Sequence, residues 1–170
     1  MSNRYSIIEK VISFILITWG GIILYELTDS MISMYRGGVR LEIVRPGLNA
    51  VFRVLLHFGV PLIVCIASII SGILLLSNKK TGWIIAIIVL LTETLYPVSF
   101  ILLHIVKPAT PYKTDVKLIL FGAIWSLIFA IMLILFLLKP FRLKYSPSSA
   151  TYLIIIVFTG LLLFSFSYNR

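Results

Sequence analysis

The chain has 170 residues, of which 60% are apolar and 12% are charged, and its net charge is +9. A soluble domain carries about 25% charged residues, so this composition excludes an ordinary water-soluble fold. We expect a single domain, residues 1–170, that is embedded in a lipid bilayer. The only cysteine of the sequence, Cys65, excludes an intramolecular disulfide and a Cys-x-x-Cys motif, and we expect it to be a small buried apolar residue.

Five segments are predominantly apolar over about the 20 residues that a spanning helix needs. They cover residues 11–28, 50–76, 82–106, 116–138 and 149–167. No segment alternates with period two over about ten residues, as a strand of a membrane barrel would. The predicted fold is therefore an all-α polytopic membrane helix bundle with about five transmembrane helices. Because the first and fifth segments are short, a bundle of four helices with one end segment in the interface is the alternative.

The connections between the spans differ in length and composition. Residues 77–81 are too few for anything but a tight turn, so the second and third spans are predicted to be antiparallel neighbours. The first loop, residues 30–49, is the longest, and residues 39–45 alternate enough to suggest an extended segment on the membrane surface. Residues 107–117 and 139–148 each contain two prolines and are predicted to be irregular linkers.

The basic residues flank the spans and form no groove with stacking aromatic residues. The net charge therefore predicts contact with the bilayer and its anionic head groups, and not with nucleic acid. The connecting loops on the N-terminal side contain no acid, which favours an N-terminus in the cytoplasm of a bacterial-type cell membrane. Six aromatic side chains near the predicted span ends are expected to anchor the bundle at the membrane interface. They are Trp19, Trp83, Tyr112, Trp125, Tyr145 and Tyr168.

Small residues four positions apart allow helices to approach closely in lipid. Such stripes occur in the second span as the pairs Ala67–Ser71 and Ser68–Gly72, and in the fourth span as Gly122, Ser126 and Ala130. Packing within the chain and docking onto another membrane subunit both account for these stripes.

Catalytic motifs are absent from the sequence. It contains no Gly-x-Ser-x-Gly nucleophile elbow, no His-Glu-x-x-His zinc motif, no phosphate-binding glycine loop and no paired aspartates of an intramembrane protease. We therefore predict no catalytic residues, no metal site and no cofactor. With two histidines and one cysteine, a catalytic set would have to be assembled from separate spans.

Glu93 is the most interior ionisable residue, because it lies near the middle of the third span. A charge at that depth costs about 2–3 kcal/mol even on lenient insertion scales. Pro97, four residues later, leaves the Glu93 carbonyl without its helical donor. Glu93 is interpreted either as a carboxyl that carries protons or as a neutral structural carboxyl that is hydrogen-bonded to another span. We expect it to be protonated in the resting protein.

Other ionisable residues are predicted to meet on the membrane face opposite the N-terminus, where the first span ends, the second begins and the third ends. These residues are Glu26, Asp29, Arg53, His57 and His104. Glu93 and His104 are eleven residues apart and so share nearly the same helix face. This geometry predicts a polar vestibule with Glu93 at its floor. The alternative is an interfacial network whose members reach toward the head groups.

Three functions remain compatible with the sequence. It favours a non-enzymatic multi-pass membrane protein that serves as an accessory, regulatory or partner-binding subunit of a membrane complex, because the chain is small, lacks catalytic motifs and has small-residue stripes. The alternative is a proton- or ion-coupled carrier or pore that uses Glu93 and the polar vestibule. The third hypothesis is an intramembrane enzyme, or a haem protein that uses His57 and His104.

Overall fold

The computed structural model describes the backbone of residues 3–36, 50–106 and 116–168, and the side chains within 5–33, 58–98 and 120–165. All regular secondary structure in these ranges is helical. The helices are α1 (Asn3–Arg36), α3 (Ala50–Leu76), α4 (Lys80–Val106), α5 (Val116–Leu137), α6 (Lys139–Tyr145) and α7 (Ser149–Tyr168). Among the described residues, α1, α3, α4 and α5 are long and apolar enough to cross a membrane, and α7 makes a fifth such span when it is joined with α6. The predicted all-α class is confirmed.

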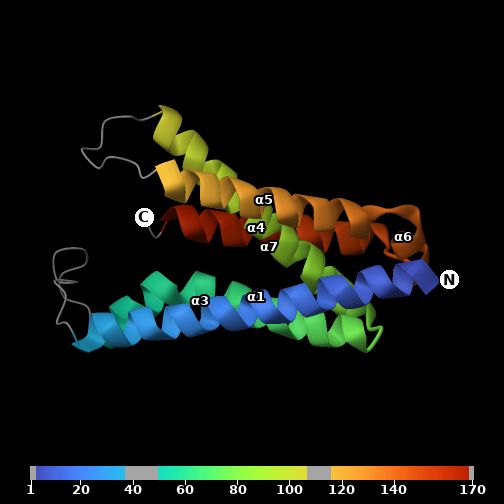
Figure 1. Ribbon diagram of the computed structural model, residues 1–170, viewed down its shortest axis with the longest axis horizontal. Coiled ribbons are helices and arrows are strands. Elements are labelled where there is room, and N and C mark those ends of the chain that lie inside the picture. The colour runs from blue at the N-terminus through green and yellow to red at the C-terminus, as the bar shows by residue number, and fades with distance from the viewer. Residues whose placement is uncertain (1–2, 37–49, 107–115, 169–170) are drawn as a thin grey trace.

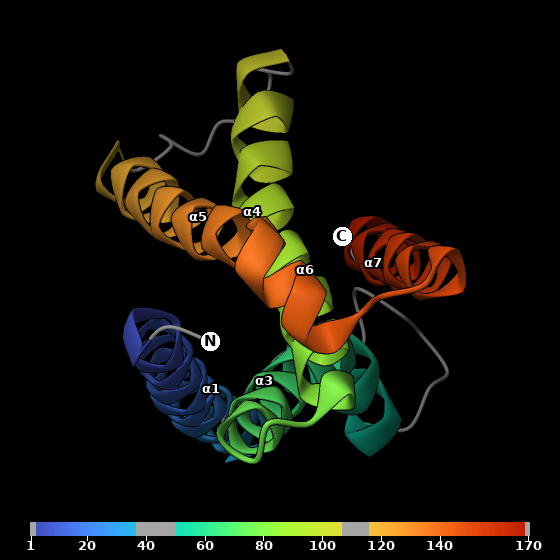
Figure 2. The same cartoon turned by 90° about the vertical axis from the view of Figure 1, so that its right-hand side faces the viewer.

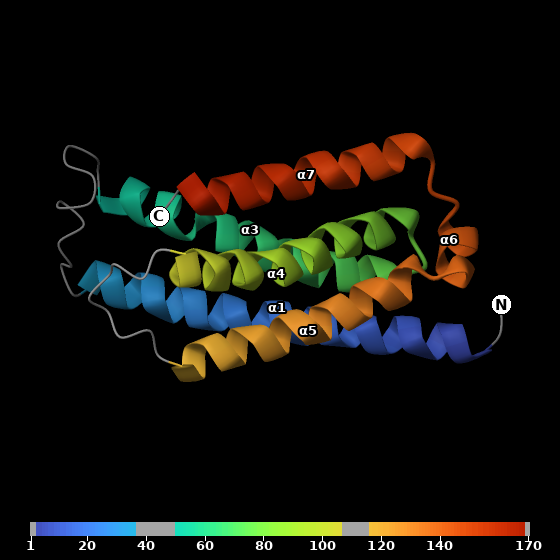
Figure 3. The same cartoon turned by 90° about the horizontal axis from the view of Figure 1, so that it is seen from above.

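α4 is the central helix and contacts α3, α5 and α7 (Figure 2). α1 packs along α3. The N-terminus, the turn between α3 and α4, and α6 lie at one end of the bundle, and the C-terminus lies at the other end (Figures 1 and 3). The chain enters and leaves at opposite ends, as five alternating passes require. The end with the N-terminus is called the amino end below.

The first helix is longer than the sequence analysis expected. α1 begins at Asn3 and continues to Arg36, whereas the predicted span covered residues 11–28. Glu9 and Lys10, which were expected to precede the first span, therefore lie within the helix, and Glu9 is 4% exposed. The Glu9 carboxyl has partners elsewhere in the fold.

The interpretation of residues 139–148 as an irregular linker was wrong, because this segment contains α6. Pro140 stands in the first turn of α6, where the missing N–H would have no helical acceptor in any case. The chain bends by 106° between α6 and α7, and Ser146 takes a left-handed conformation with φ of 43° at this bend. The segments predicted at residues 39–45 and 107–117 fall on residues outside the described backbone, apart from the first turn of α5.

α1 and α3 approach each other most closely where α1 meets the small residues of α3. A Cβ atom on Gly72 would lie 2.6 Å from Cγ1 of Ile17 and 2.7 Å from the backbone oxygen of Ser13. The Ser68 hydroxyl donates a hydrogen bond of 2.9 Å across the same interface to the Leu16 oxygen. The small pair Ser68 and Gly72 therefore packs α3 against α1 of the same chain, in the manner typical of membrane helices.

The stripe on α5 also packs within the chain. The Ser126 hydroxyl donates a hydrogen bond of 2.8 Å to the backbone oxygen of Thr94 on α4. A Cβ atom on Gly122 would lie 3.7 Å from Cβ of Pro97, which is an ordinary contact. Ala130 is half-buried on the same helix. The interface of α5 with α4 thus uses the residues that could have served a separate subunit.

The second predicted pair on α3 lies partly inside the bundle. Ser71 is fully buried, and its hydroxyl donates to the Ser68 oxygen one turn earlier at 2.8 Å. Ala67 is half-buried and packs against the hydrophobic core. Cys65, 3% exposed, is a buried residue as expected. These positions contribute to the packing of α3 within the chain.

The aromatic residues form a core rather than a belt. Trp83 is fully buried, its indole N–H donates to the Phe136 oxygen at 3.4 Å, and its ring stacks on Tyr145 with centroids 5.9 Å apart. Trp19 on α1 lies against Trp125 on α5, with centroids 4.3 Å apart. Interfacial anchoring is therefore wrong for Trp83 and Tyr145, because their rings fill interhelical space. Two of the six aromatic residues, Tyr112 and Tyr168, lie outside the described side chains.

Candidate functional site

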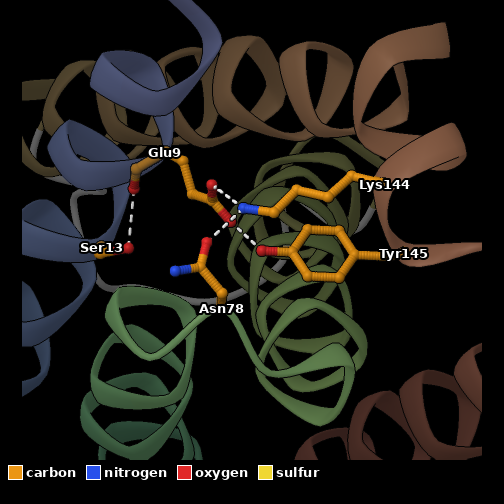
Figure 4. A network of polar contacts seen from close by, with 5 residues as sticks. All are labelled: Glu9, Ser13, Asn78, Lys144 and Tyr145. Carbon is orange, nitrogen blue, oxygen red and sulfur yellow. Dashed lines mark hydrogen bonds and ion pairs between the residues drawn. The ribbon is translucent and has the colours of Figure 1, made fainter. Parts of the chain in front are cut away.

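Two carboxyl groups are enclosed by the bundle, and the first of them is Glu9 at the amino end. The Lys144 ammonium group forms an ion pair with Oε2 of Glu9, and the Tyr145 hydroxyl donates a hydrogen bond to Oε1 (Figure 4). Lys144 also donates to the side-chain oxygen of Asn78 at 2.5 Å. The Ser13 hydroxyl donates to the backbone oxygen of Glu9 at 2.7 Å. Both carboxylate oxygens of Glu9 thus have a partner.

This network, which we call the Glu9 clamp and which consists of Glu9, Asn78, Lys144 and Tyr145, joins three parts of the chain. Glu9 comes from α1, Asn78 from the turn between α3 and α4, and the other two residues from α6. Lys80 strengthens the junction by donating to the Ser146 oxygen at 2.9 Å. A buried carboxylate that has a cation and a hydroxyl donor is compensated. The clamp therefore holds α6 against the bundle and fixes the bend that starts α7.

The sequence analysis missed the Glu9 clamp. Glu9 lay before the predicted first span, and Lys144 lay in the predicted linker, so neither was considered an intramembrane residue. Nothing in the local sequence pairs residues that are 135 positions apart. The available signal was the extended helical pattern upstream of residue 11, which places Glu9 one turn before the buried Ser13.

The second carboxyl, Glu93, is half-buried and lies beside a half-open cavity of about 170 Å³ between helices of the bundle. The lining comes from α1, α3 and α4, which correspond to the first three predicted spans. The lining residues are Trp19, Ile23, Pro61, Val64, Cys65, Thr92, Glu93 and Tyr96. We call this space the Glu93 cavity. Apart from Glu93 its wall is mostly apolar and aromatic.

Trp19 is the polar neighbour of Glu93 from another helix. Its indole N–H is buried and makes no hydrogen bond of standard geometry, while the Glu93 carboxyl is near enough to interact with it. Thr92 also lines the cavity, but its hydroxyl already donates to the Ile88 oxygen at 2.8 Å. The Glu93 carboxyl and the Trp19 indole N–H therefore both face the half-open cavity, and the indole N–H has no hydrogen bond of standard geometry there.

The two carboxyl groups differ in their access to a positive charge. No lysine, arginine or histidine is among the described residues that line the Glu93 cavity, and the described part of the chain contains no group of three metal-binding side chains. An ionised Glu93 would therefore have no compensating cation within the described wall, which makes the ionised form costly. Such a carboxyl is suited to hold a proton or to receive a cation.

The remaining residues of the predicted vestibule are distributed as follows. Glu26 and Asp29 are exposed on α1 and do not line the Glu93 cavity. The side chains of Arg53, His57 and His104 lie outside the described side chains, although their backbones belong to α3 and α4. The described part of the structure thus brings Glu93 together with Trp19, Cys65 and Tyr96, and it leaves the wider vestibule as a prediction.

Trp19 and Cys65 are the cavity residues that sequence reasoning did not assign to a site. Trp19 had been read as an interfacial anchor and Cys65 as a packing residue. Both lie within predominantly apolar stretches of their helices, so hydropathy alone does not indicate which side chains point toward α4. Comparisons with protein-family models, with curated proteins and with solved structures gave no significant match.

Proposed function

We propose that the protein binds and releases a proton or another cation at Glu93, as a small proton- or ion-coupled membrane carrier. The observation that supports this proposal is the position of Glu93 beside a half-open cavity whose described lining residues include no cation. An ionisable group within a membrane span is costly to keep, and in membrane proteins such groups mark ion and proton pathways. The cavity supplies the space that exchange at this carboxyl requires.

The physical basis of the proposal is the difference between the neutral and the ionised cavity. Protonated Glu93 is a neutral group that can accept a hydrogen bond from the Trp19 indole, and it suits a wall of apolar and aromatic side chains. Ionised Glu93 requires a positive charge nearby, because an isolated carboxylate in an apolar environment is strongly unfavourable. Loss of the proton is therefore coupled to the arrival of a cation in the cavity.

The test uses purified protein in liposomes that carry a pH-sensitive dye. With a pH gradient and an opposing gradient of potassium, sodium or tetramethylammonium ions across the vesicle membrane, wild-type protein is expected to speed the collapse of the pH gradient, and Glu93→Gln is expected to remove this effect. Thr94→Val is the matched control, because Thr94 is the next residue of α4 and does not line the cavity. Equal proton flux through the wild type and Glu93→Gln would contradict the proposal.

A second candidate function is that of a partner-binding subunit, and one observation favours it. The large apolar side chains on the outer face of α5 follow one another 4, 3, 4 and 3 residues apart. They are Leu120, Ile124, Leu127, Ile131 and Ile134, and all are exposed. This heptad spacing suits knobs-into-holes packing with another helix. The small-residue stripes give it less support than they did in the sequence, because they pack inside the chain.

Affinity purification in mild detergent with mass spectrometry tests this second function. A stoichiometric partner of the wild-type protein that is lost from the variant Leu127→Ala/Ile131→Ala would support it. Leu153→Ala/Ile156→Ala is the matched control, since these residues are equally exposed on α7. Retention of the partner by the α5 variant, or a wild-type protein without any stoichiometric partner, would count against it.

We further propose an orientation in which the amino end faces the cytoplasm of a bacterial-type membrane and contacts anionic head groups. Five cationic side chains at that end are exposed: Lys10, Lys79, Lys80, Lys139 and Arg142. Glu9, the acidic residue described at that end, is already paired with Lys144. An excess of exposed basic residues is typical of the cytoplasmic side. The test is a reporter enzyme that is active only outside the cytoplasm, fused after residue 170. We expect this fusion to be active. A fusion that is stably produced but inactive would show the opposite orientation.

A further inference from the structure

We infer that the Glu93 cavity binds a small organic cation, a protonated amine or a quaternary ammonium ion, in exchange for the Glu93 proton. This inference rests on the proposed carrier function and names the chemical class of its ligand. It follows from three properties of the described wall: its size, its charge and its aromatic content. Each property excludes another class of ligand.

The size of the cavity limits the ligand to a few non-hydrogen atoms. An engineered cavity of about 150 Å³ in another protein holds one benzene molecule, and the Glu93 cavity has about 170 Å³. A tert-butylammonium or tetramethylammonium ion is of this order, whereas a lipid chain or a nucleotide is far larger. The wall is contributed by α3 and by α1 and α4, which pack against it, so most of a much larger ligand would lie outside the opening and gain no contact with the wall.

The charge of the wall excludes anions and favours a monovalent cation. Glu93 is the acidic residue of the lining, and no basic residue is found among the described lining residues. The titratable groups that face Glu93 are the Cys65 thiol from α3 and the Tyr96 hydroxyl from α4, and α1 contributes Trp19 and Ile23, which do not titrate. Neither α5 nor α7 contributes a residue to the lining. One carboxylate balances one positive charge.

The aromatic content of the wall distinguishes an organic cation from a metal ion. Calcium binds about six to eight oxygen atoms and magnesium requires near-octahedral oxygen ligands, and the described residues contain no cluster that could hold a metal. Indole and phenol rings attract ammonium ions through their π faces, and Trp19 and Tyr96 supply such rings. The apolar side chains Ile23, Pro61 and Val64 suit the alkyl groups of an organic cation.

The exchange is balanced in charge and atoms. As the cation enters, the Glu93 O–H bond breaks and its proton leaves to water, and the carboxylate that forms neutralises the cation. The cavity therefore has no net charge before and after exchange, and no oxidant or reductant takes part. Return of the proton would expel the cation. Binding of the proton and binding of the cation at Glu93 therefore exclude each other.

The experiment is calorimetric titration of purified wild-type protein with tert-butylammonium chloride and with tert-butanol, its neutral counterpart of similar shape. We expect the cation to bind at least about tenfold more tightly than the alcohol, as one charge and a cation–π contact imply. Repeating the titration in buffers with different protonation enthalpies should reveal one proton released per cation. Tetrabutylammonium, which is too large for the cavity, is expected not to bind.

Two variants connect the binding to the cavity. Glu93→Gln should lose the binding of tert-butylammonium, and Thr94→Val should retain it. Protection of the single cysteine provides a measurement on the wild type: formation of the methyl disulfide of Cys65 by methyl methanethiosulfonate, with release of methanesulfinate, should be slowed by tetramethylammonium. Equal affinity for the alcohol and the ammonium ion, or cation binding without proton release, would overturn the inference.

Failure of the inference and failure of the proposed function give different results. If no ammonium ion binds, but the infrared band of the Glu93 carboxyl titrates and proton flux in liposomes depends on Glu93, the organic-cation inference is overturned and the carrier function stands. If neither the band nor the flux depends on Glu93, both are overturned. The two measurements use the same purified protein and can be made side by side.

Discussion

Glu9 and Glu93 are a buried and a half-buried carboxyl group of one helix bundle, and they differ in the number of partners that the described residues supply. Glu9 has a lysine and a tyrosine hydroxyl on its two oxygens, and it joins three parts of the chain. Glu93 faces an apolar cavity, and its polar neighbour from another helix is an indole N–H. Both carboxylate oxygens of Glu9 thus have a partner, whereas Glu93 can still bind a ligand.

This difference teaches how to separate structural from functional carboxyl groups in a membrane bundle. A group whose partners are all supplied by the chain gains nothing from a ligand, and its loss should be felt as lost stability. A group that faces space without a counter-ion contributes little to stability, and its loss should be felt as lost binding. Substitutions that change stability at one site and not at the other therefore test the comparison directly.

The largest expected effect is that of Lys144→Met in the Glu9 clamp. The substitution keeps much of the side chain's length but leaves the Glu9 carboxylate without a cation, at a cost of about 3 kcal/mol in the free energy of unfolding. Equilibrium unfolding in mixed micelles measures this cost. The double variant Glu9→Gln/Lys144→Met removes both charges and should regain part of the loss. Equal stability of the single variant and the wild type would show that the clamp is not structural.

The next largest loss of stability is expected from Gly72→Ala at the interface between α1 and α3. α1 carries Glu9, and both helices line the Glu93 cavity. Gly72→Ala places a methyl group within 3 Å of Ile17 and of the Ser13 backbone, so we expect a loss of about 2 kcal/mol from overpacking. The matched control is Gly122→Ala, where the nearest atom is Cβ of Pro97 at 3.7 Å and alanine should be neutral or stabilising by up to about 1 kcal/mol. If both variants lost the same stability, the close approach at Gly72 would not hold the helices together.

Much of the helical framework was accessible from the sequence, because long apolar runs give nearly the bounds of α3, α4, α5 and α7, whereas α1 extends beyond its predicted span and α6 was not predicted. α3 spans Ala50–Leu76, the range expected from hydropathy. The arrangement of side chains was not accessible in the same way. The small-residue stripes indicate a packing face of α3 but not which helix covers it, so neither Trp19 nor Cys65 could be assigned to the cavity.

The candidate site was accessible only in part. Glu93 was identified because a carboxyl in the middle of a span stands out from its neighbours. Its cavity depends on how three helices pack, which one-dimensional spacing does not determine. Glu9 was overlooked because its partner lies at the far end of the chain, and a contact between such distant residues is a property of the tertiary fold. The vestibule residues Glu26 and Asp29 remain a prediction of alternating topology.

A smaller effect is expected from Ser126→Ala, which removes one interhelical hydrogen bond close to Glu93. The Ser126 hydroxyl donates to the Thr94 oxygen at 2.8 Å, and such bonds contribute about 0.6 kcal/mol on average in a membrane bundle. The loss of unfolding free energy should be of this size, with proton flux unchanged. A loss as large as that of Lys144→Met would mean that α5 is held to α4 mainly by this bond.

The smallest expected change in stability is that of Glu93→Gln, although this substitution should abolish exchange. Glutamine has the shape of a protonated glutamate, and its amide oxygen can still accept from the Trp19 indole, so the neutral cavity is preserved. We expect the free energy of unfolding to change by less than about 0.6 kcal/mol, the mean value of one interhelical hydrogen bond. The corresponding variant at the amino end, Glu9→Gln, should lose clearly more stability, because Lys144 then has no carboxylate. The free energies of unfolding of the two variants are measured in the same micelles. Their thermal unfolding is also compared at two pH values. If Glu93→Gln were as destabilising as Glu9→Gln, Glu93 would be a structural carboxyl whose partner lies among the residues around the cavity, and the contrast between a paired and an open carboxyl would disappear.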